Sequence, residues 1–232
     1  MAAGAGKLFC AALCAATLLW TPVAIPQAVE VDLALVLAID CSFSVDSAEF
    51  RQQMQGLGLA LQDPDVWDAI ERGPNRRIAI TAFQWSDNQN QLTILPWTVI
   101  DSEQAALVTG KQLQSMKRQL AEGGTSITNA LLFAEQQFAS APTAFRRVID
   151  VSTDGRNNIG PALPPVRNAL VADGITINAL VILNEFPTLD IYAENLIIGG
   201  FGSFVDRAKS YEVYGEAILR KLLKEIVGPG IS

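Results

Sequence analysis

The pattern of apolar residues alternates between short aliphatic runs and longer stretches with helical spacing. Residues 30–40 (EVDLALVLAID) are almost continuously apolar, which is typical of a strand buried on both faces of a parallel sheet. The other strands are expected at residues 77–85, 91–99, 147–153, 175–183 and 204–208. Helices are expected at residues 47–62, 102–117, 126–139, 161–173 and 211–227. Because strands and helices alternate, the sequence predicts an α/β fold with a doubly wound, mostly parallel central sheet and helices on both faces.

One pair of strands departs from the parallel pattern. The polar turn at residues 86–90 is too short for a crossover, so the strands at 77–85 and 91–99 must run antiparallel. Pro96 lies within the second of these strands and has no backbone N–H to donate to a neighbour. We therefore expect residues 91–99 to form an antiparallel strand at one edge of the sheet.

The composition indicates a single globular domain. The chain has 232 residues, of which 50% are hydrophobic and 18% are charged, and it shows no internal repeat or linker. Its net charge is −7, and Lys and Arg do not cluster anywhere along it. A general nucleic-acid-binding protein needs a basic face to offset phosphate charge, so this class is excluded.

The first 28 residues have the pattern of a signal peptide. A single charge, Lys7, precedes an apolar run at residues 8–20, and small residues follow near Ala24 and Ala28. The apolar run is shorter than the about 20 residues that span a membrane. We expect residues 1–28 to be removed, leaving a domain at residues 29–232 with a net charge of 16 − 24 = −8. An uncleaved anchor is the alternative, and only then would the protein contact a membrane.

The remaining cysteine content bears on localisation. After cleavage only Cys41 is left, so no internal disulfide can form, and the chain has no Asn-x-Ser/Thr glycosylation site. Together with the signal peptide, these features predict export to a bacterial periplasm or to the cell exterior.

Hydroxyl and carboxylate side chains gather where the predicted strands end. Asp40, Ser42 and Ser44 alternate along an extended segment, so they project to the same side. Thr125 follows Gly123-Gly124 just before a helix, and Asp154 follows the strand at residues 147–153. In such a sheet, ligands bind beyond the carboxyl ends of the strands. Oxygen ligands of this kind are preferred by Mg²⁺ and Ca²⁺.

These segments resemble the von Willebrand factor type A domain family, over residues 31–226. That family builds a metal-ion-dependent adhesion site from Asp-x-Ser-x-Ser, a Thr, and an Asp in a Thr-Asp-Gly turn. The matching residues, in the same order, are Asp40, Ser42, Ser44, Thr125 and Asp154. The resemblance, which is strongest to exported bacterial members, implies a bound Mg²⁺, with Ca²⁺ or Mn²⁺ also acceptable. It further implies a protein partner whose exposed Asp or Glu completes the coordination.

Simple charge balance supports binding as the role of such a site. Two carboxylates just neutralise a divalent cation, and the hydroxyls add no charge. The cation therefore stays electrophilic and gains by accepting an outside anion in place of water. The leading hypothesis is an adhesion-type module that captures an acidic group of a partner.

A binding module of this kind is expected to have no small-molecule substrate, and two alternatives stand beside it, an enzyme and a purely structural metal site. The chain contains no histidine, which excludes a Ser-His-Asp hydrolase. A Mg²⁺-dependent phosphatase would use Asp40 as nucleophile, but the position of its usual general acid holds Ser42, which cannot protonate a leaving group. We therefore expect no enzymatic activity. In the second alternative, the metal only ties three loops together and stabilises the fold.

Other residues near the strand ends are expected to have ordinary structural roles. Trp85 is expected in the core, and Cys41 is expected to be a buried apolar thiol. Asp87 is expected to serve the turn in which it lies. Residues 156–158 are expected to form a solvated loop.

Overall fold

The computed structural model describes residues 1–2 and 30–230. The predicted signal peptide at residues 1–28 lies outside the described residues, apart from the first two. Within them, six strands form one sheet in the order β3-β2-β1-β4-β5-β6. The strands are β1 (Glu30–Asp40), β2 (Ile78–Trp85), β3 (Gln91–Ile100), β4 (Thr143–Thr153), β5 (Ile175–Ile182) and β6 (Val205–Ala208). Only β3 is antiparallel, to β2 at the edge, which confirms the predicted fold class.

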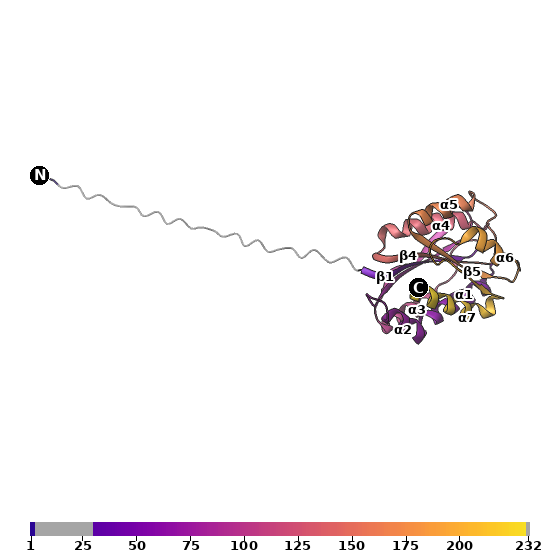
Figure 1. Ribbon diagram of the computed structural model, residues 1–232, viewed down its shortest axis with the longest axis horizontal. Coiled ribbons are helices and arrows are strands. Elements are labelled where there is room, and N and C mark those ends of the chain that lie inside the picture. The colour runs from indigo at the N-terminus through magenta and orange to yellow at the C-terminus, as the bar shows by residue number, and fades with distance from the viewer. Residues whose placement is uncertain (3–29, 231–232) are drawn as a thin grey trace.

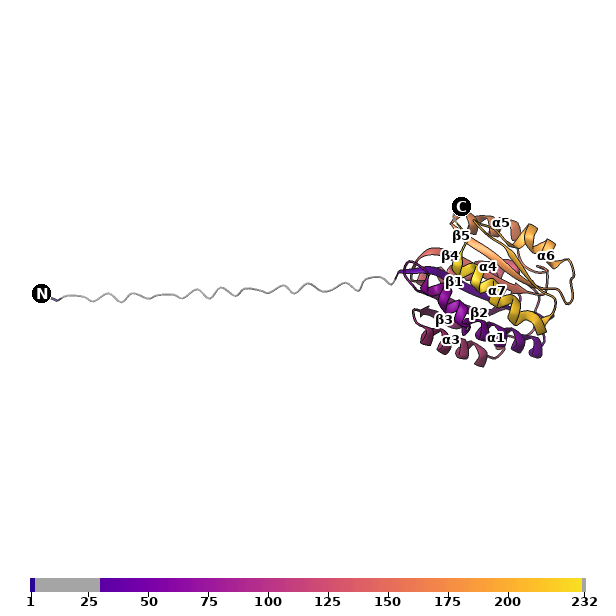
Figure 2. The ribbon, with the colours of Figure 1, turned by 60° about the horizontal axis from the view of Figure 1, so that its bottom comes forward.

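Helices cover both faces of this sheet (Figures 1 and 2). One face carries α1 (Ser47–Leu61), α2 (Pro64–Glu71), α3 (Glu103–Ser115) and α7 (Tyr214–Val227). The other face carries α4 (Ile127–Gln137), α5 (Leu163–Ala172) and the short α6 (Leu189–Tyr192), which continues into a π-helical turn, η2 (Ala193–Ile197). Two 3₁₀ turns, η1 (Phe138–Ser140) and η3 (Tyr211–Val213), complete the elements.

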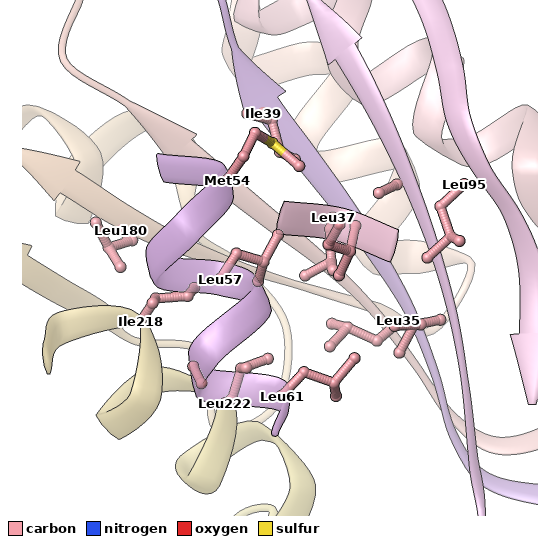
Figure 3. Packing of buried hydrophobic residues seen from close by; sticks show 14 of the residues in the cluster. Leu35, Leu37, Ile39, Met54, Leu57, Leu61, Leu95, Leu180, Ile218 and Leu222 are labelled. Atoms are coloured by element: carbon pink, nitrogen blue, oxygen red, sulfur yellow. The ribbon is translucent and has the colours of Figure 1, made fainter. Parts of the chain in front are cut away.

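The central strand β1 has a core on each side. Leu35 and Leu37 belong to the cluster shared with α1 and α7, whereas Val36 belongs to the cluster under α4 and α5. Figure 3 shows Met54 and Leu57 of α1 packed towards β1, next to residues of α7. Burying each such side chain stabilises the fold by about 1.5–3 kcal/mol. The apolar run at residues 30–40 is thus explained by burial on both faces.

Four elements, α2, α6, η2 and β4, differ from the sequence-based expectation. The helix α2 was not expected, although Asp63 caps it and Pro64 occupies its first turn; with eight residues, it is too short to show a clear periodicity. The helices from α6 to η2 were also missed. Finally, β4 begins at Thr143 rather than at residue 147, because Thr143 pairs with Glu30 of β1.

The strand order reverses between β1 and β4. The chain moves from β1 outward to β2 and β3, and then returns to place β4 on the other side of β1. A ligand-binding crevice is expected beyond the carboxyl ends of the strands at such a reversal. Asp40 ends β1 and Asp154 follows β4, so both carboxylates lie at this point. Within the described residues, no helix is long and apolar enough to cross a membrane.

Candidate metal centre

The loop that follows β1 is folded tightly around Asp40. The backbone N–H of Ser42 donates to Asp40 Oδ1 at 2.7 Å, and the N–H of Val45 donates to the Ser42 carbonyl at 3.0 Å. Asp46 then caps α1 through a capping box with Glu49. The Oγ atoms of Ser42 and Ser44 lie 3.3 Å apart. Asp40, Ser42 and Ser44 therefore share one side of the loop.

The end of β4 meets this loop directly. Ser44 Oγ donates to Asp154 Oδ1 at 2.6 Å, which joins two segments that lie 110 positions apart in the sequence. Thr153 Oγ1, one residue earlier, donates to Asp40 Oδ2. On the far side of Asp154, the hydroxyl of Tyr211 donates to Oδ2 at 3.0 Å. The two carboxylates are thus oriented by hydrogen bonds from both strand ends and from η3.

Thr125 comes from a third segment and is held by the loop after Asp154. Its N–H donates to Asn158 Oδ1 at 2.9 Å, and the Asn158 N–H donates to the Thr125 carbonyl at 2.9 Å. A Cβ placed on Gly155 would lie only 3.2 Å from Thr125 Oγ1, which shows how closely this hydroxyl approaches the Asp154 turn. Gly123 accepts a hydrogen bond from the N–H of Phe43 at 2.9 Å. All five predicted ligands consequently lie around one point of the structure.

Both carboxylates are buried without a basic partner. Asp40 and Asp154 have 0% of their surface exposed, and neither forms a salt bridge with a Lys or Arg side chain within the described part of the chain. Burial and then the charge of Asp154 raise the pKa of Asp40 to about 7, against hydrogen bonds from Thr153 and Ser42. Burial also raises the pKa of Asp154, against hydrogen bonds from Ser44 and Tyr211. Two uncompensated carboxylates in a low-dielectric site favour the binding of a cation.

The donor set fits a hard divalent cation. It consists of two carboxylates and three hydroxyls, and all of these are oxygen ligands. Residues 30–230 contain no cluster of three or more His, Cys, Asp or Glu side chains that could hold a metal ion in another way. Zn²⁺ held by Cys or His is therefore excluded in this part of the protein, whereas Mg²⁺, Ca²⁺ or Mn²⁺ fits the ligands present.

Arg118 supports the site, although nothing in the sequence singled it out. Its guanidinium donates to the Cys41 carbonyl and to the Val45 carbonyl, each at 2.6 Å. These two carbonyls bracket the segment that carries Ser42 and Ser44. Arg118 thereby fixes both ends of the loop without forming a salt bridge with Asp40 or Asp154. Tyr211 and Thr153 were not singled out either. For all three residues, the contact with the site depends on how segments distant in the sequence pack together.

Residues 156–158 form a loop in which Arg156 and Asn158 are exposed, as expected, but two of its side chains also hold the neighbouring segment. Besides the Asn158 bonds to Thr125, Asn157 Oδ1 accepts from the N–H of Thr128 at 3.1 Å in the first turn of α4. These side chains tie the Asp154 loop to the Thr125 segment. The expected roles of Trp85 and Cys41 are confirmed, because both are fully buried and the Cys41 thiol donates to the Trp85 carbonyl. Asp87 serves its turn by accepting from the N–H of Gln89.

Comparison with solved structures places the fold among known ones. Proximal thread matrix protein 1 from the mussel byssus superposes with a TM-score of 0.61 at 18% identity, over 85% of this chain and 49% of that one. A von Willebrand factor type A protein from Catenulispora acidiphila gives a TM-score of 0.58 at 18% identity, over 84% of this chain and 43% of that one. A structure of the mussel protein with a zinc-occupied MIDAS motif gives a TM-score of 0.53 at 14% identity, over 83% of this chain and 46% of that one. The chain thus spans less than half the length of each of these chains.

Comparison by sequence identifies a family for the chain. No curated protein matches the chain. A family model described as "Protein of unknown function (DUF1194)" matches residues 30–230, which is the whole of the described domain. The chain therefore belongs to the DUF1194 family, and its fold is that of the von Willebrand factor type A domain.

Proposed function

We propose that this protein is an exported binding module that captures an acidic group of a protein partner through a bound divalent cation. The residues assigned to the cation are Asp40, Ser42, Ser44, Thr125 and Asp154. Mg²⁺ is the proposed ion, and Ca²⁺ or Mn²⁺ would suit the same oxygen ligands. When bound, the cation supplies a Lewis-acidic position that accepts a carboxylate of the partner.

The observation that carries this proposal is the pair of buried carboxylates without a basic partner. Asp40 and Asp154 bring two carboxylates to one point, and no Lys or Arg side chain of the described chain forms a salt bridge with them. A divalent cation would cancel this charge and leave the centre neutral. A neutral centre with an electrophilic ion attracts an anion, whereas a centre with more carboxylates would repel it.

The comparisons supply independent support for a metal at this place in the fold. The mussel byssus protein has a MIDAS motif that holds zinc in one of its structures. That protein is a matrix protein of the byssal thread, which is in keeping with a binding role and with a location outside the cell. For the present chain, export is further supported by the signal-like pattern of residues 1–28. N-terminal sequencing of the protein from the periplasm or medium would test this part, with cleavage near residue 28 expected.

We propose binding rather than catalysis. Ser42 occupies the position at which a phosphatase of this type would need a general acid, and its Oγ instead lies 3.3 Å from Ser44 Oγ. In an assay with para-nitrophenyl phosphate and Mg²⁺, we expect no turnover above that of the Asp40→Asn variant. Turnover that depends on Asp40 would overturn this point.

The direct test of the binding role compares capture of partners with and without a chelator. Protein purified from its native compartment would be immobilised in Mg²⁺ or in EDTA, and its captured partners would be identified by mass spectrometry. The same capture would be made with Asp154→Asn and with Asp101→Asn, which changes an exposed carboxylate outside the site. We expect one set of partners that requires Mg²⁺, is lost with Asp154→Asn and is retained with Asp101→Asn.

Two results of this experiment would count against the proposal. Capture that is equal in Mg²⁺ and EDTA for every partner would show that no cation takes part. If Mg²⁺ raises the melting temperature of the protein but changes no captured partner, the metal serves the fold alone.

A further inference from the structure

We propose that Phe43 forms an apolar contact surface beside the candidate metal centre, and that the partner presents an acidic side chain flanked by an apolar one. This inference rests on the proposed function and adds the chemical class of the partner segment. It concerns a residue that no metal-binding motif requires, since Phe43 stands between two of the assigned ligands, Ser42 and Ser44.

The Phe43 side chain is exposed to solvent and therefore adds little to the hydrophobic core. Its side chain is 77% exposed, whereas Ser42 beside it is fully buried. Phenylalanine is a large apolar side chain, and its exposure leaves a substantial hydrophobic contribution unused in the folded chain. A single exposed apolar residue is common on protein surfaces. The position of Phe43 within the ligand loop is what makes its exposure informative.

The backbone that carries Phe43 is held in one conformation. Its N–H donates to the Gly123 carbonyl at 2.9 Å, which links the loop to the segment that carries Thr125. Arg118 fixes the carbonyls of Cys41 and Val45 on either side. A side chain presented by a fixed backbone loses less conformational entropy on binding than one on a mobile loop. Phe43 is therefore pre-organised for contact with a partner segment that binds at the metal centre.

A second apolar side chain borders the same place. Ile159, on the loop after Asp154, is 39% exposed. A Cβ placed on Gly124 would lie 3.0 Å from Ile159 Cγ2, while the neighbouring Gly123 bonds to Phe43. Phe43 and Ile159 thus each adjoin the Gly123-Gly124 segment, and we call the two side chains the apolar rim. A partner carboxylate that enters the centre would bring its neighbouring side chains against this rim.

The test uses three capped peptides of equal length, Ac-Gly-Asp-Gly-NH₂, Ac-Phe-Asp-Phe-NH₂ and Ac-Phe-Asn-Phe-NH₂. Binding to the ¹⁵N-labelled protein in Mg²⁺ would be measured from NMR chemical shifts. The variants are Phe43→Ser and, as a matched control, Phe201→Ser. Phe201 is 78% exposed and lies near the amino end of β5, at the opposite end of the sheet. Asp154→Asn and EDTA report on the metal centre itself.

We expect Phe-Asp-Phe to bind about tenfold more tightly than Gly-Asp-Gly, from burial of an aromatic side chain. This preference should shrink to about twofold or less in Phe43→Ser and should persist in Phe201→Ser. The Asn peptide should not bind. Binding of both Asp peptides should be lost in EDTA and in Asp154→Asn.

The two proposals fail in different ways. If both Asp peptides bind equally well and only in Mg²⁺, or if the preference survives in Phe43→Ser, the apolar rim is wrong and the proposed function stands. If the Asp peptides bind without Mg²⁺, or do not bind up to their solubility limit, the proposed function is overturned and the apolar rim falls with it.

Discussion

Asp40 and Asp154 are fully buried, and no basic side chain in the described part of the chain forms a salt bridge with them. Asp150 and Glu225, for comparison, are both within 2.6 Å of Lys221 Nζ. Asp40 and Asp154 receive hydrogen bonds only from neutral groups, such as the Tyr211 hydroxyl. The assigned ligands are therefore oriented by neutral donors, which leave their charge available to a cation.

Replacing Tyr211 with Phe tests whether this orientation matters. Its hydroxyl donates to Asp154 Oδ2, so Tyr211→Phe should weaken Mg²⁺ binding about tenfold by freeing that carboxylate. Tyr214→Phe is a matched control, because the Tyr214 hydroxyl is also buried but bonds to Ser152 instead. It should leave the affinity for Mg²⁺ unchanged. Isothermal titration calorimetry measures both variants, and an equal effect of the two would argue against a specific role for Tyr211.

The proximity of the assigned ligands was predictable in part from local sequence, but the contacts that support them were not. Alternation along an extended segment placed Ser42 and Ser44 on one side, and their Oγ atoms do lie 3.3 Å apart. Arg118, in contrast, contacts a carbonyl 77 positions away, and the contact exists only because the segment after α3 returns to the loop after β1. Local patterns carry no information on such a pairing.

At the scale of elements, a buried charge network fixes α7 to the sheet. Lys221 Nζ lies 2.6 Å from Asp150 Oδ1 of β4 and 2.6 Å from Glu225 Oε1, one helical turn further on. Asn178 of β5 donates to the same Glu225 oxygen at 2.9 Å. The three titratable side chains are at most 2% exposed, so two carboxyl groups share one ammonium group in the core.

Removing the positive charge of Lys221 from this network should destabilise the folded protein. Lys221→Met leaves two buried carboxylates without a counter-charge, and we expect the free energy of unfolding to fall by about 3–5 kcal/mol. Lys224→Met is the matched control, because Lys224 pairs with Asp206 on the surface and is 54% exposed. That change should cost about 1 kcal/mol or less. Urea unfolding monitored by circular dichroism gives both values, and similar costs would contradict a stabilising role for the network.

The same network predicts a pH dependence of stability. Burial, followed by the charge of Asp150, raises the pKa of Glu225 from 4.5 to about 7, although Lys221 and Asn178 lower it. The folded chain thus binds this proton more tightly than the unfolded chain. The resulting stabilisation is fully present below pH 4.5 and is lost as the pH rises to about 7.

Glu225→Gln isolates this contribution, because glutamine does not ionise. In EDTA, the free energy of unfolding of the wild type minus that of Glu225→Gln should fall as the pH is raised from 4.5 to 7. It should then stay constant at higher pH. Urea unfolding at a series of pH values measures this difference, and a difference that is independent of pH over the same interval would show that Glu225 titrates normally.

The elements that the sequence predicted well are those with long, regular patterns. The amphipathic spacing of Tyr214, Ile218, Leu222 and Ile226 located α7 to within a few residues, and all four side chains are buried. The helix α2 was missed because only eight residues form it. Its stability comes from the Asp63 cap and from burial of a few side chains, and neither produces a repeat that is visible in the sequence.

At the scale of the whole molecule, topology brings the three ligand segments together. The strand order reverses between β1 and β4, so the carboxyl ends of these neighbouring strands lie side by side at the place where such folds bind ligands. The sequence predicted this arrangement because its strands and helices alternate and because its parallel strands are continuously apolar. The register of β4 against β1, which sets the distance from Asp154 to Ser44, became visible only in three dimensions.

The most direct test of the metal centre is a calorimetric titration of the chelator-treated protein with Mg²⁺. We predict saturable binding of a single ion per chain in the wild type and in Asp101→Asn, and a loss of binding of at least about a hundredfold in Asp154→Asn. If the wild type binds Mg²⁺ no more tightly than Asp154→Asn does, the five oxygen side chains do not form a metal site.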